Sequence, residues 1–183
     1  MLIRDTPAGF GLISRLNHWF MAVAIFAMFG LGWWMVGLDY YSPYYNSAPD
    51  LHRSLGILLL AALVFRILWR LKNVSPDDAE LSAIERKASR IVQLGFYPLL
   101  LALFVSGYLI STPDGRPIDV FGLFAVPSLI QGKGISDAAG LIHRILSYGT
   151  MALALVHTAA ALKHHIIDKS SILTRMWSGP PSP

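Results

Sequence analysis

Four apolar runs separated by polar connections set the pattern of the chain. They cover residues 16–38, 51–71, 90–112 and 138–165. A helix of about 20 apolar residues crosses the hydrocarbon core of a bilayer, and each run is long enough to do so. The first run follows Arg4 and Arg15 as a signal peptide would, but it is too long, contains Trp33 and Trp34, and lacks a small-residue cleavage site. The pattern predicts an all-α fold in one domain, residues 1–183, with four membrane-spanning helices.

The connections between the runs differ in character. Residues 39–50 are rich in tyrosine, serine and proline, which predicts an interfacial loop. Residues 70–90 are the most charged stretch and predict a solvated connection with an amphipathic helical segment near residues 81–89. Residues 118–130 are apolar but too short to span, so we expect them to lie flat in the interface and cap the bundle. The proline- and serine-rich C-terminus is expected to be loose.

Composition supports a membrane protein. The chain is 54% hydrophobic and 14% charged, with a mean hydropathy of +0.51. The net charge of +4 would suit nucleic-acid binding only if the basic residues were clustered for it, and they follow the membrane topology instead. With four spans, the side that holds both termini and the 70–90 connection carries ten basic residues. The opposite side carries four, Arg53, Arg116, Lys133 and Arg144, and Arg66 lies within a span. The positive-inside rule therefore predicts cytoplasmic termini.

Four of the six histidines fall into two pairs at matching depths. His143 and His157 are fourteen residues apart, so they share one helix face at a rotation of about 40° and a separation of about 21 Å. The predicted topology places His18 with His157 near the cytoplasmic side. It places His52 with His143 near the outer side. Each pair comes from two different helices.

Paired imidazoles from facing helices suit haem iron. Neutral imidazole is a good iron ligand, and ionisable groups inside a membrane are usually functional. The chain has no cysteine, which excludes thiolate ligands and covalent attachment of c-type haem. We therefore predict two non-covalent b haems. The alternatives are histidines that merely pack in the bundle, a zinc site, for which the ligand number fits less well, and Met151 as an axial ligand.

Four arginines are candidate partners of the haem propionates, because they lie near the predicted ligands. They are Arg53 and Arg144 at the outer level and Arg15 and Arg66 at the inner level. The alternative is that they extend along the helices to the membrane surface. Gly95 and Gly107 in the third run permit close helix contact.

Five motifs in the chain resemble the bacterial cytochrome b561 family. They are S-R-L-N-H-W (14–19), L-H-R-S-L-G (51–56), F-G-L-F-x-x-P (121–127), H-R-I-L-S-Y (143–148) and H-x-x-A-A-L-x-H-H (157–165). The resemblance implies a dihaem four-helix cytochrome of the bacterial inner membrane. It also implies that His18, His52, His143 and His157 are the axial ligands, the same four residues that the depth argument selects.

The resemblance implies two possible roles. Some members are superoxide oxidases that pass electrons from the periplasmic side to ubiquinone. Related b-type subunits carry electrons from a partner dehydrogenase or hydrogenase to quinone. The absence of a large soluble extension favours the enzyme, whereas the outer side, with four basic and five acidic residues, shows no overall attraction for an anion. A transporter is a third reading, but no span shows paired helix breaks.

Two sets of polar residues are candidates for the chemistry at the two ends. Arg116, Lys133 and Arg144 would steer superoxide towards the outer haem. Lys163, His164, His165 and Asp168 follow the inner ligand and would relay protons to a quinone. The alternative for the second set is a polar rim. The oligomeric state is left open.

Overall fold

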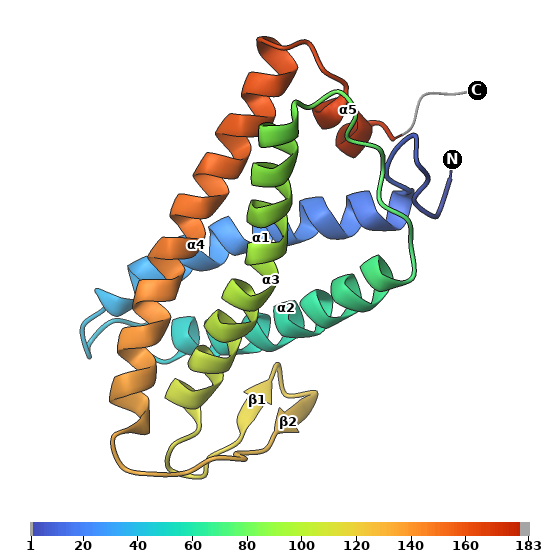
Figure 1. The fold of residues 1–183 in the computed structure, drawn as a ribbon. Coiled ribbons are helices and arrows are strands. Elements are labelled where there is room, and N and C mark those ends of the chain that lie inside the picture. The colour runs from blue at the N-terminus through green and yellow to red at the C-terminus, as the bar shows by residue number, and fades with distance from the viewer. Residues whose placement is uncertain (1, 180–183) are drawn as a thin grey trace.

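The computed structural model describes residues 2–179. Four long helices account for most of this range: α1 (Leu12–Val36), α2 (Ser47–Leu71), α3 (Ala83–Ser111) and α4 (Ile135–Ile166). A hairpin of β1 (Ile118–Val120) and β2 (Phe124–Val126) lies between α3 and α4, and the short helix α5 (Ile172–Trp177) follows α4 (Figure 1). All four long helices are long and apolar enough to cross a membrane. The prediction of an all-α, four-helix membrane protein is confirmed.

The helices begin a few residues before the predicted spans, and the largest difference is at α3. This helix starts at Ala83 because Ser82 and Glu85 form a capping box, in which the Ser82 hydroxyl accepts from Glu85 N at 3.4 Å and Ser82 N donates to the Glu85 carboxylate at 3.2 Å. The segment near residues 81–89 is helical as expected. It continues into the third span as a single helix, which differs from the separate solvated segment that was predicted.

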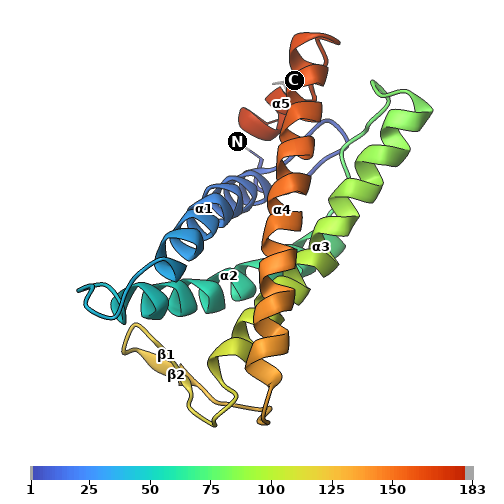
Figure 2. The ribbon, with the colours of Figure 1, turned by 90° about the vertical axis from the view of Figure 1, so that its left-hand side faces the viewer.

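The helices pack as two pairs. α1 packs on α2 and α3 packs on α4, while α2 also contacts α3 and α1 makes a smaller contact with α4. The α3–α4 pair crosses the α1–α2 pair (Figures 1 and 2). Where the pairs meet, Met21, Leu63 and Leu100 from three helices form a buried apolar cluster. Most other apolar side chains on these helices are partly exposed, as expected where lipid takes the place of protein contacts.

The apolar segment after α3 forms a hairpin held against protein, a pairing that the expectation of a segment lying flat in the interface did not include. Ile118 and Val120 are buried, and Val120 is completely inaccessible. β1 packs on α2, where the Ser54 hydroxyl donates to the Asp119 carbonyl at 3.1 Å. β-strand pairing satisfies the backbone groups of this short apolar stretch, which a flat, irregular segment would leave unpaired.

The segment after α4 is fastened to the opposite end of the bundle. Ser171 N donates to the Glu80 carboxylate at 2.7 Å, Arg175 donates to the Asp77 carbonyl at 2.6 Å, and the Trp19 indole donates to the Met176 carbonyl at 3.1 Å. The hydrogen bonds from Ser171 lower the pKa of the Glu80 carboxyl. The proline- and serine-rich terminus that was expected to be loose begins only after this segment, at residue 178. The expectation for residues 180–183 lies outside the described residues.

Candidate functional site

The structure brings the four predicted histidines together as two pairs. His18 on α1 and His157 on α4 have ring centroids 6.3 Å apart, with the rings inclined at 67°. His52 on α2 and His143 on α4 have ring centroids 6.3 Å apart, with the rings inclined at 77°. All four side chains are partly buried. Two pairs with the same separation therefore stand at two levels of the bundle.

The separation of the rings suits a metal ion held between them. A bond from imidazole nitrogen to a metal is about 2.0 Å long and the ring centre lies about 1.1 Å behind the nitrogen, so a metal in line between two imidazoles separates their centroids by about 6 Å. The observed 6.3 Å agrees with this value at both levels. Direct hydrogen bonding between neutral rings would not require the same spacing at two levels, where α4 meets two different helices.

The surroundings of the outer rings also suit a bound group. His143 Nδ1 lies 2.9 Å from the Leu103 carbonyl and 3.2 Å from the Ser106 hydroxyl, which orients the ring and leaves Nε2 for a metal. His52 Nδ1 is buried and has no hydrogen-bond partner among residues 2–179. A buried polar atom without a partner is costly unless a bound group completes the site. The donor set of the outer pair thus fits bis-histidine haem.

Two glycines let the outer rings lie close against neighbouring helices. A Cβ on Gly32 of α1 would be 3.1 Å from His52 Cε1, and a Cβ on Gly107 of α3 would be 3.1 Å from His143 Cε1. Neighbouring helical glycines differ, since a Cβ on Gly30 or Gly95 would meet nothing within 4 Å. Sequence reasoning singled out Gly95 and Gly107 as close-contact residues. It was right for Gly107 and wrong for Gly95, and it missed Gly32.

Comparison with known proteins agrees with this geometry. Residues 9–179 match the family model described as prokaryotic cytochrome b561. The chain belongs to the prokaryotic cytochrome b561 family. It is 46% identical to cytochrome b561 homolog 2 of Escherichia coli (strain K12) over 180 residues, which cover 96% of this chain and 95% of that protein. It is 26% identical to cytochrome b561 homolog 1 of the same organism over 164 residues, 87% of this chain and 91% of that protein.

Membership in the cytochrome b561 family means that the chain is a membrane cytochrome that uses b-type haem to transfer electrons across the membrane. The histidine pairs offer the nitrogen ligands that such a haem needs, and no cysteine competes for it. Residues 12–166 contain all four helices and both histidine pairs, so the family match covers the whole of the candidate site.

The arginines of this cytochrome b561 homologue occupy different positions relative to the histidines. Arg66 reaches the inner pair: its Nη2 lies 3.3 Å from His18 Nδ1, and its Nη1 donates to the Asn17 side-chain oxygen at 3.5 Å. Arg15 donates to the Trp177 carbonyl and thereby caps α5. Arg53 forms a salt bridge with Asp50. Arg66 is therefore the arginine whose contacts place it directly at a histidine pair.

The three cationic residues predicted to steer an anionic donor are exposed. Arg116 forms a salt bridge of 3.3 Å with Asp114, and both side chains are more than half exposed. Lys133 and Arg144 are also exposed, and the ion pairs within residues 2–179 do not include them. No described contact joins the three residues into one patch.

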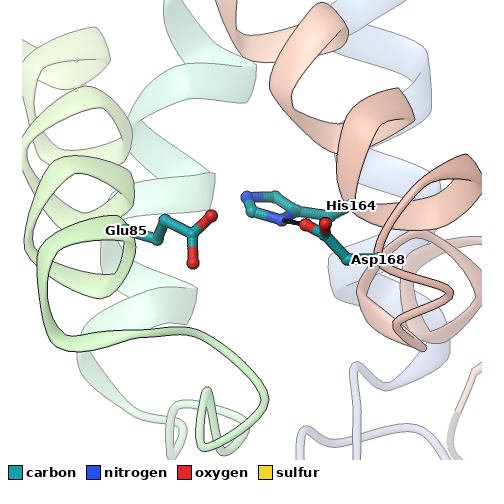
Figure 3. Close-up of side chains that lie close together, drawn as sticks. All are labelled: Glu85, His164 and Asp168. Atoms are coloured by element: carbon teal, nitrogen blue, oxygen red, sulfur yellow. Dashed lines mark hydrogen bonds and ion pairs between the residues drawn. The ribbon is translucent and has the colours of Figure 1, made fainter.

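A charged cluster lies beyond the inner pair, where α4 ends. Lys163 Nζ lies 2.7 Å from the Glu85 carboxylate and 2.8 Å from the Asp168 carboxylate, and His164 Nδ1 lies 2.7 Å from Asp168. Figure 3 shows Glu85 approaching from α3 towards His164 and Asp168. The hydrogen bonds from Lys163 and His164 lower the pKa of the Asp168 carboxyl, so it stays ionised at neutral pH.

This cluster was predicted only in part. The sequence pattern selected Lys163, His164 and Asp168 from their position after His157, but Glu85 lies on another helix, 78 residues before Lys163. No local signal in the sequence connects them. His165, which was grouped with His164, is exposed and belongs to none of the described ion pairs of residues 2–179.

The glycine contacts generate a first prediction. Replacing Gly32 or Gly107 by valine should displace the adjacent histidine ring, because overpacking of this kind costs about 1–3 kcal/mol. Haem loss and a shifted midpoint potential should follow at the outer level. Haem content per chain and a redox titration of the reduced spectrum measure this effect. Gly30→Val and Gly95→Val are the matched controls and should retain normal haem binding. Unchanged haem content and potentials in both Gly32→Val and Gly107→Val would show that the close approach is not needed.

Proposed function

We propose that this chain carries electrons through two b haems, from superoxide at the outer side of the bacterial inner membrane to ubiquinone near the cytoplasmic side. The observation that supports this most strongly is the pair of histidine contacts, each with a centroid separation of 6.3 Å. His18 and His157 would hold the inner haem, and His52 and His143 the outer haem. Haem supplies one-electron chemistry at each level when it is bound.

The proposed direction rests on the distribution of charge. Ten basic residues on the side of both termini, against four on the opposite side, favour cytoplasmic termini. His18 then lies near the cytoplasm because α1 begins there, and His52 lies near the outer surface because α2 begins on that side. The cluster of Glu85, Lys163, His164 and Asp168 stands at the cytoplasmic end and the hairpin at the periplasmic end.

Removing single ligands tests the proposed haem number and assignment. The wild type should contain about two haems per chain, with low-spin spectra, and an alanine at any ligand position should lower this to about one. His18→Ala and His157→Ala should remove the inner component of a redox titration, while His52→Ala and His143→Ala should remove the outer one. His165→Ala is the matched control. One haem per chain in the folded wild type, or unchanged spectra in all four variants, contradicts the proposal.

The residues beyond the inner pair suit proton delivery to a quinone. Reduction of ubiquinone to ubiquinol takes up two electrons and two protons. His164 is seven residues from His157, so the two share a helix face at a separation of about 10 Å. Asp168 accepts a hydrogen bond from His164 Nδ1, which leaves Nε2 to carry a proton towards the membrane. Lys163 and Glu85 connect this pair to the surface.

Substitution of His164 or Asp168 should slow the reduction of ubiquinone and leave haem reduction by dithionite unchanged. His164→Ala should lower the rate of ubiquinone reduction by at least about tenfold, because a positioned general acid or base accelerates proton transfer by that factor or more. Asp168→Asn should have a smaller effect in the same direction, because it removes the partner that orients the ring. His165→Ala is the control. Rates are measured as a function of pH, alongside haem reduction by dithionite. Wild-type rates and pH profiles in His164→Ala and Asp168→Asn would rule out the relay.

Superoxide as the donor is supported by the resemblance to superoxide oxidases and by three exposed cations on the outer side, Arg116, Lys133 and Arg144. A single-electron anionic donor suits a haem. The overall charge of the outer side does not favour an anion, since four basic residues face five acidic ones. This balance favours the second candidate function, in which a partner dehydrogenase or hydrogenase delivers the electrons.

Stopped-flow mixing separates the two donors. Oxidised protein should be reduced by superoxide faster than in a control that contains superoxide dismutase. Replacing Arg116, Lys133 and Arg144 together by glutamine should slow association about tenfold at low salt. The difference should shrink at 1 M salt, where the Debye length falls from about 10 Å to about 3 Å. Lys87→Gln, on the cytoplasmic side, is the control. Reduction no faster than with superoxide dismutase favours the partner-dehydrogenase function instead.

A further inference from the structure

A surface pocket lies at the end of the bundle that carries the hairpin, and none of the four paired histidines lines it. It has a volume of about 700 Å³, and its walls come from the end of α1, the start of α2, the loop between them and the hairpin. This volume is in the range of sites for small ligands and headgroups. The pocket is unrelated to the charged cluster at the cytoplasmic end and to the three outer cations, none of which lines it.

The apolar part of the pocket is unusually exposed. Trp34, Tyr44, Leu51 and Phe121 are each between 42% and 55% exposed, although they line one hollow together. The rings of Trp34 and Tyr44 lie 5.6 Å apart. Tryptophan and tyrosine gather where the hydrocarbon core meets the headgroups, so this wall lies at the headgroup level of the outer leaflet.

The hairpin holds its side of the pocket in a strained conformation. Phe121 has a φ of 54°, which is uncommon for a bulky residue. Ser54, which is buried, maintains it by accepting from Phe121 N at 3.4 Å while donating to the Asp119 carbonyl at 3.1 Å. Gly122 N donates to the Asp119 carboxylate at 2.7 Å. These contacts position an aromatic ring and a carboxylate at one rim.

The polar part of the pocket is acidic. Asp50 and Asp119 line it, and no basic residue does. Asp50 is neutralised by Arg53, whereas the ion pairs found within residues 2–179 do not include Asp119. An ammonium group here would meet a carboxylate and the faces of Trp34 and Tyr44, both of which attract cations. In a phosphoethanolamine headgroup, two carbons and an ester oxygen separate the ammonium nitrogen from the phosphorus, so the phosphate would lie further out, towards Ser47, which lines the pocket, and Arg53 beyond it at the start of α2.

From these contacts we infer that the pocket binds an aminophospholipid of the outer leaflet. The ammonium of the headgroup pairs with Asp119, the phosphate lies towards Ser47 and Arg53, and the acyl chains follow Leu31 and Leu51 into the membrane. Phosphatidylglycerol would bring only negative charge to an acidic pocket. Phosphatidylcholine has a quaternary ammonium that cannot donate a hydrogen bond to Asp119. The inference does not depend on which molecule donates electrons to the cytochrome.

Native mass spectrometry of the haem-loaded protein tests this inference. The protein is delipidated in detergent and titrated separately with dioleoyl phosphatidylethanolamine, phosphatidylcholine and phosphatidylglycerol. One phosphatidylethanolamine should be retained per chain, at a concentration about tenfold lower than the other two lipids require. Water-soluble glycerophosphoethanolamine should compete weakly, because it lacks the chains that lie along Leu31 and Leu51.

Asp119→Asn is the decisive variant, because it removes the charge and keeps an oxygen that can accept from Gly122 N. It should weaken phosphatidylethanolamine retention about tenfold and abolish the preference over phosphatidylcholine. Asp114→Asn is the matched control, since Asp114 is an exposed outer carboxylate that does not line the pocket. An unchanged haem spectrum reports intact folding. Equal retention of the three lipids by the wild type, or an unchanged preference in folded Asp119→Asn, would overturn the inference.

Discussion

The contact between imidazoles from different helices is the interaction on which the rest of the structure depends. It is repeated at two levels because fourteen residues make nearly four helical turns, which returns a side chain to the same face about 21 Å away. His143 and His157 use this spacing on α4. His18 and Gly32 repeat it on α1, and His52 and Arg66 repeat it on α2. Each of these helices thus places one residue at each level. The residues of α1 and α2 also meet at both levels: Gly32 lies against His52 at one, and Arg66 lies against His18 at the other.

The remainder of the bundle is arranged around these two levels. Few side chains of residues 2–179 are fully buried, and most of the apolar surface is left for lipid to cover. The two ends are closed in different ways. The hairpin closes one end through Ser54, and at the other end the segment after α4 is held by Glu80 and Asp77. The two ends therefore offer different environments: aromatic and acidic side chains lie beside the hairpin, and a dense cluster of charges lies where α4 ends.

The sequence was sufficient to predict the spans and the histidine pairs, because both follow from the regular geometry of a helix in a membrane. Hydrophobic length defines a span, and a spacing of fourteen residues defines a shared face. Prediction from the sequence failed for the features that depend on contacts between segments far apart in the chain. Nothing near Glu85 indicates that it meets Lys163, and the short run around Val120 has the same composition whether it lies on lipid or pairs as a hairpin. Gly32 was missed for the same reason, since its role is defined by a ring on another helix.

The central claim is that each histidine pair holds one haem iron. The direct measurement is anomalous diffraction at the iron edge from crystals of the haem-loaded protein. The account predicts two iron peaks about 21 Å apart, one between His18 and His157 and one between His52 and His143. A single peak, or an iron bound to any residue outside these four, would contradict it.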